Sequence, residues 1–127
     1  DVAMLLSRWE GFGLAIVEYM AAEKNVVATR ADAIPSLIED GKDGFLVGID
    51  NPEQAADKVL WLHNHPNEAD EMRQKALQKV KSKYDINRVV KQHIDMFNKL
   101  IPVGGAEQNN ALIVSVAHLS SEERRAA

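Results

Sequence analysis

The chain has 127 residues, a length that suits one ordinary domain. Hydrophobic residues make up 46% of it and charged residues 27%, and the formal net charge of −4 is not concentrated in a block of like charge. This balance argues against a nucleic-acid-binding surface or a polybasic membrane patch. The sequence has no cysteine, which excludes disulfides, thiolate catalysis and cysteine-ligated zinc within it and fits a reducing cytoplasm.

Short apolar runs in the first half of the chain predict strands. They have the length and the unbroken hydrophobicity of buried strands in parallel sheets, and they cover residues 2–6, 26–28 and 45–47. The sequence Asp-Gly-Lys-Asp-Gly at residues 40–44 is a strong turn signal before the third run. The chain opens at Asp1 in the middle of a predicted strand and without an initiator methionine, which suggests a fragment, a processed chain or an engineered one.

Helices are predicted between these strands and after them. The predicted helices cover residues 14–24, 34–39, 52–63, 67–83 and 86–100. Asn51 and Asp85 stand where each would cap a helix, and Pro52 suits a first helical position. Strands that alternate with helices predict an α/β fold with a parallel sheet and flanking helices. Three strands are too few for a complete sheet of this kind, so further strands are expected elsewhere.

Packing is the expected role of most large side chains. In the helix at 14–24, Leu14, Val17 and Ala21 share one apolar face, with Ile16 and Met20 beside it. Trp9 and Trp61 are expected to pack, and His93 falls on the apolar face of the last helix, which favours a core position. The pair at residues 63 and 65, His-x-His, would suit a metal in a strand but falls at the end of a predicted helix.

Two glutamates flank a glycine-containing turn between the first strand and the following helix. Glu10 lies in the loop, Gly11-Phe12-Gly13 leads into the helix, and Glu18 falls on its second turn. Glycines let a backbone approach a ligand closely, and the free N–H groups at a helix start suit a phosphate. Carboxylates placed in this way can hold sugar and ribose hydroxyls. By spacing alone, the commoner explanation is two surface glutamates that interact favourably with the dipole at a helix start.

A long collinear stretch resembles a known family. It begins with Ser7-Arg8-Trp9-Glu10-Gly11-Phe12-Gly13-Leu14, followed by Glu18 and Val26-Val27-Ala28-Thr29, and is similar to the E-x7-E signature of retaining glycosyltransferases with the two-Rossmann (GT-B) fold. The likeness continues through Ile34-Pro35, Asp43-Gly44-Phe45-Leu46-Val47 and Asn51-Pro52-Glu53 and covers residues 1–101. The family includes sucrose synthases, bacterial glycogen synthases and capsule or lipopolysaccharide glycosyltransferases. The resemblance implies a Rossmann-like part of the C-terminal, donor-binding domain, followed by a tail at residues 102–127.

The resemblance also implies a reaction and a set of site residues. The reaction is hexosyl transfer from a nucleotide-sugar donor to an acceptor with retention. Glu10 would contact the donor sugar or stabilise charge near its anomeric carbon. Gly11, Phe12, Gly13 and Leu14 would offer backbone contacts to sugar and diphosphate, and Glu18 would bind the ribose hydroxyls.

The implied partners are the nucleotide-diphosphate sugar and an N-terminal acceptor-binding domain, with no metal or other cofactor. This chain alone would then be an incomplete catalytic unit. The expected location is cytoplasmic, with peripheral membrane association of the full enzyme as an option. The donor sugar, its base and the acceptor stay open.

The sequence departs from the family pattern near this loop. Glu23-Lys24-Asn25 stands where the family often has Gly-Lys-Pro, Asp32-Ala33 replaces a Gly-Gly pair, and Ser36 replaces an acidic residue. These departures favour an alternative, a non-catalytic α/β binding or assembly module that keeps the fold. A response-regulator-like domain is a poorer hypothesis, because no predicted strand ends in an aspartate.

The tail admits competing interpretations. Residues 113–122 resemble the first strand of the same donor domain, with His118 where an arginine usually binds phosphate, which implies a permuted order or the start of a second copy. Residues 104–108, Gly-Gly-Ala-Glu-Gln, instead resemble a loop of the acceptor domain. A strand or helix without a catalytic role is the third interpretation.

Overall fold

The computed structural model describes residues 1–100, and the tail at 101–127 lies outside the described residues together with every prediction made for it. The chain divides into two compact units, Asp1–Asp85 and Ile86–Ala127. The first unit holds the sheet and most of the helices, and the described part of the second is a single helix. Within residues 1–100, no helix combines the length and the apolar character needed to cross a membrane.

The described strands form a parallel sheet, as predicted. Strands β1 (Val2–Leu5), β2 (Asn25–Thr29) and β3 (Phe45–Val47) follow one another in the order β1-β2-β3. In this register Ala28 of β2 lies opposite Leu5 on one side and Leu46 on the other. Central strand β2 is buried along its whole length, which explains its unbroken run of small and branched apolar residues.

The prediction that β1 is a buried strand was wrong. Along β1, exposed and half-buried residues alternate, and Val2 and Met4 are exposed. The cause is position, because β1 lies at the edge of the described sheet and has a partner strand on the β2 side alone. An apolar run therefore predicted the strand but not how deeply it is buried.

The helices agree with the sequence pattern except near their ends. They are α1 (Leu14–Ala21), α2 (Ile34–Leu37), α3 (Pro52–Asn64), α4 (Pro66–Lys83) and α5 (Ile86–Leu100). Helix α1 ends before residue 24 because Glu23 adopts a left-handed φ of +54°. The predicted cap of α3 is confirmed, since Asn51 Oδ1 accepts a hydrogen bond from the Gln54 backbone N–H at 2.9 Å.

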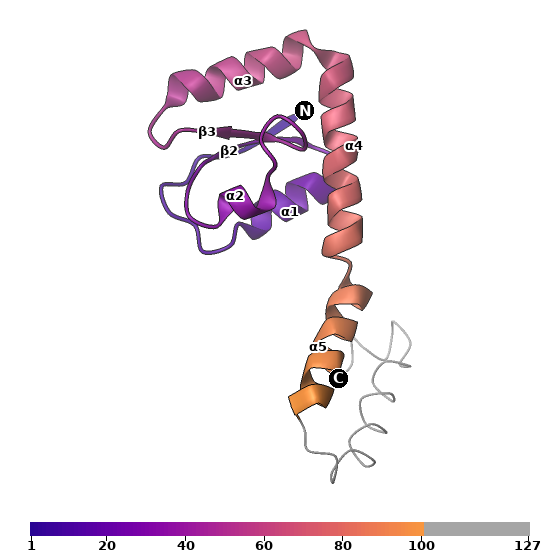
Figure 1. Ribbon diagram of the computed structural model, residues 1–127. Helices are drawn as coiled ribbons and strands as arrows, with labels where there is room; N and C mark the ends of the chain where they lie inside the picture. The colour runs from indigo at the N-terminus through magenta and orange to yellow at the C-terminus, as the bar shows by residue number, and fades with distance from the viewer. Residues whose placement is uncertain (101–127) are drawn as a thin grey trace, which may run out of the picture. The chain divides into compact units, whose positions relative to one another are not determined.

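Hydrophobic clusters cover both faces of the sheet, so the fold is a layered α/β structure with helices on each side (Figure 1). On one face, Ile16 and Met20 of α1 pack against Val26 and Ala28, together with residues of α2. On the other, Ala55 and Leu62 of α3 pack in a cluster with Val27 of β2 and with Phe45 and Val47 of β3. The predicted Rossmann-like arrangement of a parallel sheet and flanking helices is confirmed.

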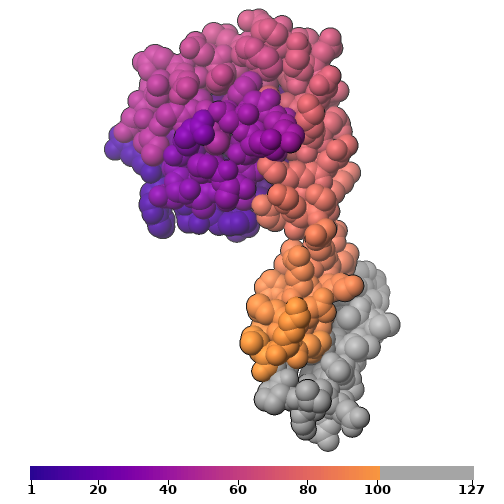
Figure 2. Space-filling view, viewed as in Figure 1, coloured from indigo at the N-terminus to yellow at the C-terminus, as the bar shows by residue number. Residues whose placement is uncertain are grey.

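Helix α4 contributes to both clusters. Ala69 and Met72 in its first half belong to the α3 side, whereas Ala76 and Val80 in its second half belong to the α1 side. On the face shown in Figure 2, the N-terminal segments, coloured indigo to purple, lie directly against α3 and α4. A single helix therefore joins the two cores.

Apolar periodicity did not always predict burial. In α1 the buried residues are Ile16 and Met20, which lie beside the predicted apolar face, while Leu14 on that face is 68% exposed. His93 is exposed, and helix α5 has no buried residue despite its strongly amphipathic sequence. Periodicity defines an apolar face but does not provide the surface that would cover it.

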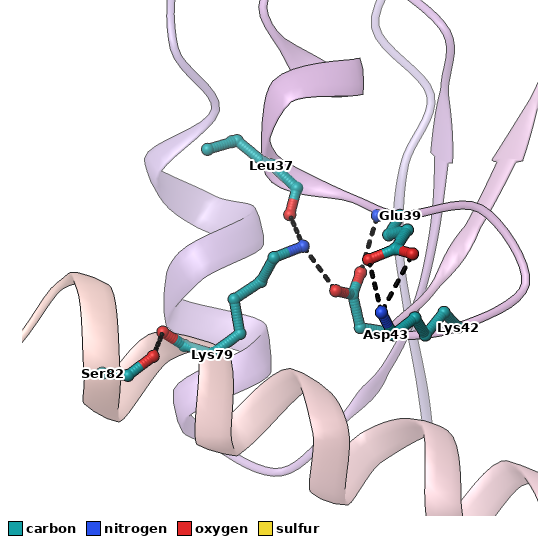
Figure 3. Close-up of polar contacts among 6 residues, drawn as sticks. All are labelled: Leu37, Glu39, Lys42, Asp43, Lys79 and Ser82. Carbon is teal, nitrogen blue, oxygen red and sulfur yellow. Dashed lines mark hydrogen bonds and ion pairs between the residues drawn. The ribbon is translucent and has the colours of Figure 1, made fainter.

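A buried ion pair attaches α4 to the turn before β3 (Figure 3). The Lys79 ammonium donates to the Asp43 carboxylate and also to the Leu37 carbonyl, the latter at 2.8 Å. The other Asp43 oxygen accepts the Glu39 backbone N–H at 2.8 Å. Side-chain exposure is 16% for Lys79 and 5% for Asp43, so little water competes for this pair. It fixes the 38–44 turn against the helix.

The same turn carries an exposed ion pair between Glu39 and Lys42. The Lys42 ammonium donates to both Glu39 carboxylate oxygens, at 3.0 and 2.9 Å. This hydrogen bonding, with a smaller contribution from the lysine charges nearby, lowers the pKa of Glu39, and the same contact raises the pKa of Lys42.

Removing the Lys79 ammonium should leave the Asp43 charge buried without its partner. We expect Lys79→Met to lower the free energy of unfolding by about 3 kcal/mol, measured by urea denaturation followed by circular dichroism. The matched control is Lys75→Met on the same helix, whose 3.7 Å pair with Glu71 is exposed, and it should change stability by less than about 0.5 kcal/mol. Equal losses in the two variants would contradict a special role for Lys79.

The Glu39 contact should add a small pH dependence. Because the folded-state pKa of Glu39 is lowered, its contribution to stability is present above the unfolded-state pKa and is lost as pH falls through the folded-state value. In a carbon-detected NMR titration, Lys42→Met should move the Glu39 pKa upward toward its ordinary value. An unchanged Glu39 titration in that variant would rule out Lys42 as the cause.

Candidate functional site

The loop that follows β1 leads directly into the N-terminus of α1. Gly13 is the residue before the helix, with a left-handed φ of +89°. In the structure of residues 1–100, no side chain caps this helix and its first turn holds no acidic residue. Helix starts without a cap leave backbone N–H groups for water or a ligand, and the helix dipole makes that end favourable for negative charge. The local geometry therefore suits an anion.

The predicted site residues lie together on this loop and the first two turns of α1. Glu10 is half-buried in the loop, and Gly11 and Phe12 after it are exposed. Leu14 is exposed at the first position of α1, and Glu18 is exposed one turn later. The sheet is parallel and the loop follows the last residue of β1, so all of them belong to its carboxyl-terminal edge, where open α/β sheets bind ligands.

The two glycines of the loop differ in what they require. A Cβ on Gly13 would lie 3.2 Å from Leu37 Cδ1 and 3.3 Å from Ile16 Cδ1, in a backbone conformation that L side chains rarely adopt. A Cβ on Gly11 would meet nothing within 4 Å. Gly13 is therefore required by the fold itself, whereas the space beside Gly11 is open.

Contacts from the ends of the neighbouring strands hold this loop. The Thr29 hydroxyl at the end of β2 donates to the Ser7 carbonyl at 2.5 Å. The Glu10 backbone N–H donates to Asp32 Oδ2 at 3.1 Å, and Arg8 Nε donates to Asp50 Oδ1 at 2.8 Å. Sequence reasoning missed both aspartates as loop contacts. Each is the third residue after its strand, which is a signal only once the strands are known to be parallel neighbours.

Aromatic side chains near the loop do not all pack as predicted. Phe12 makes an edge contact with Tyr84, with ring centroids 6.3 Å apart, so its side chain turns toward the end of α4. Trp9 is 76% exposed, so the prediction that it packs was wrong. Trp61 does pack, edge-on to Phe45 at 5.2 Å. Trp9 therefore presents a large, open aromatic surface beside Glu10.

The two histidines differ, because His65 packs on a neighbouring aromatic ring while His63 is exposed. His63 lies in the last turn of α3, while His65 stacks on Trp61 at 4.4 Å and its Nδ1 contacts the Trp61 carbonyl oxygen at 2.8 Å. Within residues 1–100, no group of three or more acidic, histidine or cysteine side chains is arranged to hold a metal ion.

A groove of about 660 Å³ lies at the opposite end of the sheet. Its lining includes Val2 and Asn25, the first residues of β1 and β2, and side chains of α3 and α4 such as His63 and Arg73. None of the predicted site residues lines it. The groove and the loop at residues 7–13 are therefore separate features on the two ends of the parallel strands.

Alanine substitutions should show that the fold requires glycine at position 13 but not at position 11. We expect Gly13→Ala to lower the free energy of unfolding by about 1–3 kcal/mol, because it adds a strained φ and a crowded Cβ. Gly11→Ala should change it by less than about 0.5 kcal/mol. Chemical denaturation of both variants measures this difference, and a loss at Gly11 that matches the loss at Gly13 would contradict it.

Comparison with known proteins identifies the family. The model for "Glycosyl transferases group 1" matches residues 1–79. Trehalose synthase of Pyrococcus horikoshii is 37% identical over 100 residues, which cover 79% of this chain and 24% of that protein. Poly(ribitol-phosphate) alpha-N-acetylglucosaminyltransferase of Staphylococcus aureus is 36% identical over 93 residues, which cover 72% of this chain and 19% of that enzyme. The chain thus spans about a fifth to a quarter of the length of these relatives.

Solved structures agree. The C-terminal domain of the group 1 glycosyl transferase LpcC of Francisella tularensis is 36% identical, with a TM-score of 0.64 over 68% of this chain and 44% of that one. Anabaena HepE, solved in complex with UDP-glucose, is 24% identical with a TM-score of 0.75 over 78% of this chain and 28% of that one, a likeness that bears on the fold alone. The chain belongs to the glycosyl transferase group 1 family and has the Rossmann-like fold of the C-terminal domain of GT-B glycosyltransferases.

Proposed function

We propose that residues 1–101 bind the nucleotide-sugar donor of a retaining glycosyl transfer. One observation carries the proposal: the open N-terminus of α1 at the carboxyl edge of a parallel sheet, with Glu10 in the loop before it and Glu18 on its second turn. The relatives named as glycosyltransferases support the choice of reaction.

The parts of the donor are assigned by chemistry. The diphosphate lies at the start of α1, where backbone N–H groups and the helix dipole favour an anion. Open space at Gly11 lets the ligand approach the backbone. Glu18 accepts the two ribose hydroxyls, and Glu10 contacts the sugar or stabilises positive charge near its anomeric carbon. Phe12, Gly13 and Leu14 contribute main-chain contacts, and no metal takes part.

In the transfer itself, the bond between the anomeric carbon and the diphosphate oxygen breaks. The acceptor hydroxyl oxygen bonds to the same face of that carbon, and its proton passes to the departing diphosphate. The acceptor comes from an N-terminal acceptor-binding domain, in keeping with the larger size of the relatives, so this chain supplies the donor-binding part of the catalytic unit. A cytoplasmic location, with membrane association of the full enzyme, stays a prediction.

A second candidate is a non-catalytic module that keeps the fold. The observation that favours it is the residue at position 32. The family usually has a glycine there, whereas this chain has Asp32, whose carboxylate contacts the loop. This departure from the residue pattern of the family is what favours a module without catalysis. The same binding experiment separates the two functions.

Titration calorimetry of the chain with UDP, GDP, ADP, UDP-glucose and GDP-mannose tests the proposal. We expect Glu18→Ala to weaken binding of the preferred nucleotide about 10–100-fold, because it removes two hydrogen bonds to a charged group. Glu10→Ala should weaken the nucleotide sugar more than the free nucleotide.

The matched control is Glu71→Ala, which removes an exposed glutamate from α4 and should leave affinity within about twofold. Absence of binding to every nucleotide would favour the non-catalytic module. Binding that is indifferent to Glu18→Ala would overturn the site assignment even if the chain does bind a nucleotide.

A further inference from the structure

Two aspartates at the carboxyl edge of the sheet combine a left-handed backbone conformation with a contact to the loop at residues 7–13. Among the described residues, the non-glycine positions with positive φ are Glu23, Asp32 and Asp50. Glu23 follows the end of α1, where a left-handed residue is ordinary. Asp32 and Asp50, at φ +37° and +56°, instead lie just after β2 and β3, and both carboxylates contact the loop at residues 7–13.

The left-handed conformation is unfavourable for a non-glycine residue, although aspartate tolerates it better than most, and glycine would avoid the cost. At position 32 the usual glycine of the family would adopt the same φ without this cost, but it would have no carboxylate. Asp32 is exposed, so its hydrogen bond is weakened by water and adds little to the stability of the fold as a whole. Its effect is therefore local to the group that it contacts.

That group is the backbone N–H of Glu10, 22 residues away in the sequence. A bond to the main chain restrains the direction in which the Glu10 side chain leaves the loop, and it leaves the Glu10 carboxylate free for a ligand. The Asp50 contact is of another kind, because the Asp50 carboxylate accepts from the Arg8 side chain and not from the Glu10 backbone. The Arg8 side chain is 79% exposed. Only the Asp32 contact acts directly on the proposed sugar-binding residue.

We propose that Asp32 is a positioning residue for Glu10: its carboxylate holds the Glu10 main chain in the conformation that contacts the donor sugar before the donor arrives. This inference rests on the proposed function of Glu10. It predicts that Asp32 determines how much the sugar adds to nucleotide binding, while the ribose contact at Glu18 is independent of it. A purely structural role would weaken both equally.

The first test needs no ligand. Asp32→Gly keeps the positive φ and removes the acceptor, and it should speed hydrogen exchange of the Glu10 amide about threefold to tenfold, measured by NMR on the 127-residue chain. Asp32→Asn retains an acceptor oxygen and should restore the rate to within about twofold of the original. The matched control, Asp50→Gly, removes the other strained aspartate and should change this rate by less than about threefold. An unchanged Glu10 rate in Asp32→Gly overturns the proposal.

The second test compares the dissociation constants of UDP and UDP-glucose, or of GDP and GDP-mannose if the original chain prefers guanine. Asp32→Gly should reduce the ratio of the affinity for the nucleotide sugar to the affinity for the free nucleotide about threefold to tenfold. The dissociation constant of the free nucleotide itself should stay within about twofold of the original value. Rescue by Asp32→Asn supports positioning, whereas equal weakening of both ligands overturns it. If the original chain binds no nucleotide, the proposed function fails, and the Glu10 exchange rate still decides whether Asp32 fixes that backbone.

Discussion

The structure of residues 1–85 depends on the complete burial of β2. A central strand of a parallel sheet exposes neither edge nor face to water, so each face needs a covering layer and each strand edge a neighbour. Helix α1 with α2 provides one layer, α3 provides the other, and α4 packs against both. The Lys79–Asp43 pair then fixes α4 to the turn before β3, where charge is tolerated because each group has several polar partners.

Burial of the sheet also explains where the candidate site lies. Side chains fill both faces, so the places where backbone groups stay accessible are the loops at the strand ends. At the carboxyl edge, the start of α1 has no side-chain cap in the described structure. Position 13 requires glycine because of its left-handed φ and because the side chains of Leu37 and Ile16 would crowd a Cβ. The fold thus creates an electropositive helix end and sets the conformation of the residue before it, while the space beside Gly11 stays open.

Loop contacts at this edge are individually weak, because Arg8, Asp32 and Asp50 are exposed to water. These contacts matter for geometry, because Asp32 connects the loop after β1 to the segment that follows β2, and Asp50 connects it to the segment that follows β3. A loop with such contacts retains one conformation without adding to the core. This arrangement suits a site in which the positions of a few groups matter more than overall stability.

Sequence alone determined the strands, the helices, their parallel α/β arrangement and the placement of Glu10 and Glu18 on one loop–helix unit, because periodicity, caps and turn residues are local. It did not determine how far β1 is buried, which side of α1 packs against the sheet, or that Trp9 and His93 are exposed, since burial depends on which elements become neighbours. Only the tertiary structure revealed Asp32 and Asp50 as loop contacts. They become neighbours of the loop when β1, β2 and β3 pair in parallel, and no local pattern encodes contacts between residues 22 and 42 positions apart.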